Sequence, residues 1–211
     1  MKQEIYTING VIRFIKRDFS SPKPISLEKS KKNLLDIKKV LDKNSVKFGL
    51  MFGTLLGAVR ENNFIAHDED IDLFVLEENR QHLLNSLHDL IKIGFEVCRY
   101  EDTLLSIMRD DEYIDFYFFF KYFLLYRKCS AGLTYKSRYL EKTIDYNFLG
   151  EIFQVPVDTE KFLEVLYGDG WRVPIKNDPS MSHSKYIIVR EKIKSNFPFL
   201  FKIISKIKSK L

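Results

Sequence analysis

The stretch FGTLLGAVRENNFIAHDEDIDLFVL, residues 52–76, decides how this chain folds. It places Asp70 and Asp72 two residues apart at the start of an apolar run that includes β-branched side chains. Residues i and i+2 of a β-strand point to the same face, so the two carboxylates are predicted to lie side by side. Ile71 and Leu73 then point into a core. The stretch therefore predicts a strand with two acids at its entry.

Two neighbouring carboxylates repel each other unless a cation lies between them, and a hard divalent ion such as Mg²⁺ prefers carboxylate oxygens. Upstream, Gly53 and Thr54 form a predicted turn that ends one strand and opens a short helix. Free backbone N–H groups at such a helix start can bind a phosphate. Carboxylates for a metal ion and a turn for phosphate are what a phosphoryl-transfer site requires.

Two further residues are candidates for the same site. Asp115 begins a predicted strand in the pattern Tyr-Ile-Asp-Phe-Tyr. It could complete a metal site or accept the proton of an attacking hydroxyl, although it could also be an ordinary acid at a strand end. Arg60 lies about one helical turn beyond the Gly-Thr turn, where it could reach a phosphate or remain a solvated helix-end arginine.

The acidic segment has other interpretations. A calcium loop requires Gly and Glu where this chain has Leu73 and Asn79, so that interpretation is rejected. Nucleotide-sugar glycosyltransferases also use a short Asp-x-Asp pattern, and this interpretation stays open at this point. His67 could be a ligand or a proton carrier, although a single histidine is more often structural. We include His67 and Asp68 among the candidate substrate-binding residues.

The net charge of +5 is distributed unevenly over the 211 residues. Residues 1–47 carry twelve Lys and Arg against five Asp and Glu, and residues 185–211 carry eight against one. Each end is therefore +7, which leaves the middle at −9. A body that bound nucleic acid would show the reverse, so no nucleic-acid partner is expected. An acidic body that handles an anionic substrate needs metal ions, and basic ends suit an anionic membrane surface.

The chain divides into three predicted parts. Residues 1–26 are a basic segment and linker, with a possible amphipathic element at 10–19, residues 27–180 are the main domain, and residues 181–211 are a basic amphipathic helix. No signal peptide is apparent, and neither is an apolar run of the about 20 residues that a membrane span requires. The two cysteines have no metal-ligand spacing, which suggests a reducing compartment. Helices are predicted near residues 27–42, 55–60, 79–93 and 158–167, and strands near 46–50, 71–76, 95–100, 104–109, 113–120 and 152–155.

These motifs resemble the LicD family, within the nucleotidyltransferase fold superfamily that also includes the fukutin-related proteins. The resemblance rests on residues 52–60 and 64–72, and it is supported by FLGEIFQVP at 148–156 and by 162–171. It implies an α+β, nucleotidyltransferase-like domain with a small mixed β-sheet flanked by helices. It also implies that Gly53 and Thr54 hold donor phosphates, that Asp70 and Asp72 bind Mg²⁺ (or Mn²⁺), and that Asp115 is the third metal and catalytic carboxylate.

The resemblance further implies an activity. LicD-like enzymes transfer phosphocholine, phosphoethanolamine or a polyol phosphate from a CDP-activated donor to a sugar hydroxyl. We therefore expect a CDP-linked donor, a cell-surface glycan or lipid-linked glycan as acceptor, and a cytoplasmic protein that is peripheral on the membrane through its C-terminus. A true nucleotidyltransferase that releases pyrophosphate and a non-catalytic membrane-associated scaffold are the alternatives.

Overall fold

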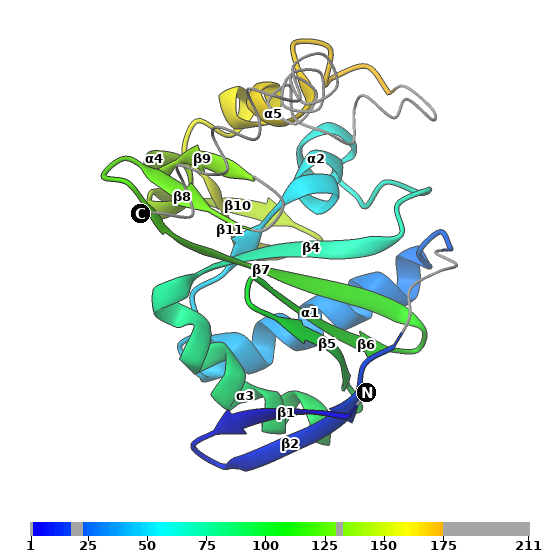
Figure 1. Ribbon diagram of the computed structural model, residues 1–211. Coiled ribbons are helices and arrows are strands. Elements are labelled where there is room, and N and C mark those ends of the chain that lie inside the picture. Colours follow the sequence, from blue (N-terminus) through cyan, green and yellow to red (C-terminus); the bar gives the residue numbers. More distant parts are fainter. Residues whose placement is uncertain (1, 18–22, 130–132, 175–211) are drawn as a thin grey trace, which may run out of the picture. The chain divides into compact units, whose positions relative to one another are not determined.

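The computed structural model describes residues 2–17, 23–129 and 133–174. The chain forms two compact units, residues 1–157 and 158–211, which we describe separately. The elements of the first unit are coloured along the sequence in Figure 1. Its helical segments are α1 (Leu27–Lys43), α2 (Phe52–Glu61), η1 (Glu77–Asn79), α3 (Arg80–Lys92) and α4 (Ser137–Glu141). Its strands are β1 (Lys2–Thr7), β2 (Gly10–Ile15), β3 (Gly49–Leu50), β4 (Asp70–Leu76), β5 (Glu96–Glu101), β6 (Leu104–Arg109), β7 (Glu112–Tyr122), β8 (Tyr126–Lys128), β9 (Thr134–Lys136), β10 (Thr143–Phe148) and β11 (Glu151–Pro156).

A mixed β-sheet forms the centre of this unit, as the resemblance implied. Its main strand order is β3-β4-β7-β6-β5, and β8 with β9 extends the far end of β7. β4 and β7 are parallel, whereas the other neighbours are antiparallel. Helices α1 and α3 lie on one side of the central sheet and α2 on the other (Figure 1). The architecture is therefore α+β with a small mixed sheet between helices.

The core follows the apolar periodicities of the sequence. Leu34, Ile37 and Leu41 recur at helical spacing in α1 and are fully buried. In β4, Ile71 and Leu73 are also fully buried, as predicted for the face opposite the two acids. Burial of these side chains is the main driving force that fixes α1 and β4 in the unit.

The N-terminal segment differs from the expected amphipathic element. β1 and β2 pair as an antiparallel hairpin, with a turn that ends at Gly10, whose φ of +120° suits glycine. The hairpin is attached to α3, because Thr7 Oγ1 lies 2.9 Å from His88 Nε2 and the Ile8 N–H donates to Asn85 Oδ1. Contacts with a helix over 70 residues away in sequence therefore select the hairpin.

The second unit contains the predicted helix α5 (Thr159–Tyr167), which ends at Gly168 with a φ of +84°. Arg172 pairs with Glu160 across this unit at 2.5 Å. The predicted amphipathic helix at 181–211 lies outside the described residues. Within the described ranges, no helix is both long enough and apolar enough to cross a membrane.

Candidate active site

The parallel pairing of β4 and β7 brings the predicted acids together. Asp72 of β4 lies directly opposite Asp115 of β7, and Asp70 lies two residues earlier on the same strand as Asp72. Asp72 and Asp115 are only 6% and 4% exposed, whereas Asp70 is half-buried. The predicted three-acid cluster therefore forms where two neighbouring strands begin.

The start of helix α2 is attached to the same acids. The Gly53 N–H donates to Asp72 Oδ2 at 3.0 Å, and the Asp72 N–H donates to Thr54 Oγ1 at 2.8 Å. The Met51 N–H also donates to the Asp72 backbone carbonyl at 3.0 Å. Thr54 is fully buried, so its hydroxyl connects α2 to β4. Its expected contact with a donor phosphate stays a prediction.

Asp68 approaches Gly53 closely. A Cβ atom on Gly53 would lie 2.1 Å from Asp68 Oδ2, which is far inside van der Waals contact. Only glycine therefore allows the Asp68 carboxylate to remain where it is. This contact places a fourth acid beside Asp70 and Asp72, at the start of α2.

The cluster is electrostatically strained in the absence of a cation. Burial, followed by repulsion from Asp115, Asp68 and Glu69, raises the pKa of Asp70 to about 8. Burial is also the main cause that raises the pKa of Asp68 to about 6. The pKa of Asp72 is raised well above its ordinary value by burial and then by Asp70, Asp68 and Asp115. Ionising the whole cluster requires a positive charge nearby.

Arg99 is a site residue that sequence reasoning missed. Arg99, Ser106, Asp115 and Asp72 form one row across β5, β6, β7 and β4, because each is registered opposite the next. Arg99 Nη2 donates to Asp115 Oδ2 at 2.8 Å, and Arg99 Nε donates to Ser106 Oγ at 2.9 Å. Burial raises the pKa of Asp115, and Arg99 opposes this shift. Only the strand register could have revealed this partner.

Tyr117 is the second residue that was missed. It follows Asp115 by two positions on β7, so the two side chains share a face of the strand, close to the charges of Asp72 and Asp70. Burial and then the charges of Asp72, Asp115 and Asp70 raise its pKa strongly, so it remains a neutral donor. Its ring packs edge-on against Phe52, with the centroids 4.9 Å apart. The sequence signal that could have identified Tyr117 is the alternation of side chains between the two faces of β7, which puts residues 115 and 117 on the same face.

Comparison with known proteins identifies the family. Residues 45–158, more than half of the chain, match the family described as "LicD/FKTN/FKRP, nucleotidyltransferase domain". The chain belongs to the LicD family. The matched segment includes Gly53, Thr54 and all four clustered acids.

Two curated relatives of this LicD-family chain are named ribitol-5-phosphate transferase FKTN, from Homo sapiens and Macaca fascicularis. Each is 27% identical over 169 residues, a match that covers 75% of this chain and 37% of the relative. The chain thus spans well under half the length of these relatives. The solution structure of the antibiotic-resistance factor ANT(2'')-Ia has a TM-score of 0.54 at 13% identity and covers 88% of this chain and 100% of that chain. Together with the family match, this likeness confirms the nucleotidyltransferase-like fold.

The donor set of the LicD-family site fits a hard divalent cation. All the candidate ligands are carboxylate oxygens, and within the described part of the chain the buried Asp115 Oδ1 has no hydrogen-bond partner. Among the described residues, no three His, Cys, Asp or Glu side chains are already arranged to hold a metal ion. Mg²⁺ is usually bound by one or two carboxylates and substrate phosphates, so a preformed three-ligand protein cage is not required.

Arg60 and His67 are the remaining predicted site residues of this LicD-family chain. Arg60 Nη2 lies 2.6 Å from Glu61 Oε1, and Glu61 is near enough to Asp68 to raise its pKa. His67 is exposed, and its charge lowers the pKa of Asp68. His67 therefore lies near Asp68, whereas Arg60 is paired with Glu61. The contacts of both residues with substrate stay predictions.

Proposed function

We propose that this chain transfers a phospho-substituent from a CDP-activated donor to a sugar hydroxyl of a glycan, with Mg²⁺ or Mn²⁺ as cofactor. Membership of the LicD family and likeness to the FKTN relatives support a transferase. The observation that carries the proposal is the parallel register of Asp72 and Asp115, with the Gly53 amide directed at Asp72. This arrangement places several acids and a helix start at one location.

Asp70 and Asp72 would hold the metal ion, which, when bound, neutralises negative charge on the donor diphosphate. A cation held there would also offset the burial and repulsion that raise the pKa values of the cluster. Arg60 would support the donor phosphates from its position beside Glu61. These assignments account for a group of acids that is unfavourable without a cation.

Asp115 is suited to orient the acceptor. Arg99 holds one carboxylate oxygen, and the other oxygen, Oδ1, is buried and has no hydrogen-bond partner among the described residues. The acceptor hydroxyl would donate its proton to Oδ1 while its oxygen attacks the phosphorus of the transferred group. The bond between this phosphorus and the bridging oxygen breaks, and CMP leaves with the electron pair.

The relatives suggest which donor to test first. The FKTN relatives are named ribitol-5-phosphate transferases. We therefore rank CDP-ribitol first, followed by CDP-glycerol, CDP-choline and CDP-ethanolamine. A surface glycan or its lipid-linked precursor is the proposed acceptor, and a cytoplasmic location on the membrane face is proposed with it.

The test is to incubate the full chain with each CDP donor, with and without Mg²⁺, and to measure released nucleotide by chromatography. We expect metal-dependent release of CMP. An Asp72→Asn variant should lose at least about a hundredfold in rate, about 3 kcal/mol of activation free energy. Pyrophosphate release from a nucleoside triphosphate would instead indicate a nucleotidyltransferase. A complete lack of turnover with every donor would favour a non-catalytic scaffold.

A further inference from the structure

The turn between β7 and β8 exposes three consecutive large apolar side chains. Phe123, Leu124 and Leu125, which we name the apolar tip, are 78%, 98% and 70% exposed. Phe123 also adopts a φ of +55°, which is unfavourable for a bulky aromatic residue. Exposed apolar clusters of this kind mark interaction sites in soluble domains.

Residues that suit a membrane interface surround the apolar tip. Tyr122 and Tyr126 are paired directly beneath it, and tyrosine is enriched where lipid hydrocarbon meets water. Lys121, Lys128 and Lys136 lie on the same three strands, β7, β8 and β9. Lys121 and Lys136 are exposed, and Lys128 Nζ lies 4.9 Å from the centroid of the Tyr122 ring. The order from the tip is therefore apolar, then aromatic, then cationic.

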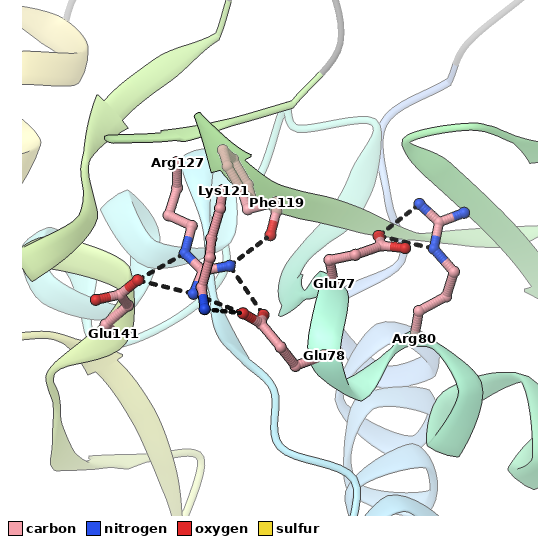
Figure 2. Close-up of polar contacts among 7 residues, drawn as sticks. All are labelled: Glu77, Glu78, Arg80, Phe119, Lys121, Arg127 and Glu141. Carbon is pink, nitrogen blue, oxygen red and sulfur yellow. Dashed lines mark hydrogen bonds and ion pairs between the residues drawn. The ribbon is translucent and has the colours of Figure 1, made fainter. Parts of the chain in front are cut away.

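Ion pairs and a backbone hydrogen bond hold the strands next to the apolar tip in place. Figure 2 shows Arg127 of β8 between Glu78 and Glu141. The Arg127 side chain is 3% exposed, and its contacts are 2.8 Å to Glu78 and 2.7 Å to Glu141. The Ser137 N–H also donates to the Leu125 carbonyl at 2.8 Å. Lys121 also pairs with Glu78 at 3.4 Å, so Arg127 and Lys121 together balance the charges of Glu78 and Glu141. Lys128 and Lys136 then give the strands beneath the tip their positive charge, which attracts anions.

We propose that the apolar tip inserts into the interfacial region of an anionic lipid bilayer. Apolar burial together with attraction between lysines and anionic headgroups is what drives such binding. A second copy of the chain fits less well, because tip-to-tip contact would bring the lysine groups together. A three-residue turn is also far smaller than a stable protein interface, which needs about 1,200 Å² or more. The predicted C-terminal membrane contact concerns different residues.

The first experiment measures co-sedimentation of the full chain with vesicles of phosphatidylcholine containing phosphatidylglycerol, and with phosphatidylcholine alone. Leu124→Asp should reduce affinity for the anionic vesicles at least about tenfold. The matched control is Ile8→Asp, since Ile8 is also 78% exposed at a hairpin turn but stands between the polar residues Thr7 and Asn9 instead of in a run of three apolar side chains. Ile8→Asp should bind as the unmodified chain does. Equal binding by Leu124→Asp would overturn the proposal.

A second experiment reports on the tip itself. Leu124→Trp should show a blue-shifted fluorescence maximum with anionic vesicles and quenching by spin-labelled lipids, beyond the signal of Trp171 in the unmodified chain. An unshifted, unquenched spectrum would refute insertion even if another segment binds the membrane. Light scattering should show that Leu124→Asp leaves the oligomeric state unchanged. A dimer that this variant abolishes would assign the tip to self-association instead.

Discussion

At the scale of single residues, the site is defined by acids that are unfavourable together. Asp72 is held by the Gly53 amide and the Thr54 hydroxyl, yet its neighbours Asp70 and Asp115 repel its charge. The hydrogen bonds fix its position, while burial and repulsion favour its protonated form. Its contribution to stability and its proposed contribution to catalysis should therefore have opposite signs.

Asp72→Asn should raise the melting temperature of the metal-free protein by a few degrees, because asparagine is neutral in both states, whereas Asp72 must be buried either charged or after taking up a proton. Asparagine keeps an oxygen that can accept the Gly53 N–H. The same variant should be strongly impaired in the donor assay described above. Thermal unfolding in EDTA is the measurement, and a lowered melting temperature would contradict the assigned repulsion.

Arg99 should act through Asp115. Arg99→Gln removes the guanidinium that opposes the raised pKa of Asp115, so the acidic limb of the pH–rate profile should move to higher pH. Arg99→Lys should restore part of the original profile, because it keeps the charge but not the bond to Ser106. A loss of rate without a change in the pH profile would indicate that Arg99 only stabilises the sheet.

At the scale of elements, sequence reasoning succeeded where an element carries its own periodicity. The helical spacing of Leu34, Ile37 and Leu41 predicted α1, and alternation around Asp70 and Asp72 predicted β4. β8 and β9 have three residues each, too few for a periodic pattern. Arg99 could not be found in this way, since its role arises from strand register.

The Arg127 network offers a test of how elements are joined. It connects η1, β8 and α4 through Glu78 and Glu141 (Figure 2). Arg127→Met should lower the free energy of unfolding by about 2 kcal/mol, because it removes a buried guanidinium that makes charged hydrogen bonds with two half-exposed acids. Lys121→Met is the matched control: Lys121 pairs with the same Glu78 but is 73% exposed. Its effect should stay below about 1 kcal/mol in denaturant titrations. Equal losses of unfolding free energy in the two variants would show that burial of Arg127 adds nothing to the strength of its ion pairs.

At the scale of the whole molecule, two sets of acids respond to pH in opposite directions. The pKa of Glu78 is lowered to about 2, chiefly by its hydrogen bond with Arg127, so its stabilisation is lost as the pH falls through the acidic range. The raised pKa values of Asp68 and Asp70 mean that the folded state binds more protons than the unfolded state. Stability from this cluster therefore falls as the pH rises from about 4 to about 8.

Thermal unfolding as a function of pH and metal tests this balance. We expect the metal-free protein to lose stability from about pH 5 to about pH 8, and Mg²⁺ to restore it at the higher pH. At about pH 5, Mg²⁺ should have much less effect, because protons occupy the same oxygens. A metal effect that is equal at both pH values would count against binding at these acids.

Strand β7 fixes the distance between the proposed active site and the apolar tip. Asp115 lies near the beginning of β7, and Tyr122 ends it next to the apolar tip. Their separation of seven residues corresponds to about 23 Å along a strand. With the tip anchored in headgroups, the length of β7 would set the distance from the bilayer at which an acceptor hydroxyl can reach Asp115. Shortening or lengthening the acceptor's stem should then change the rate without any change in the acids.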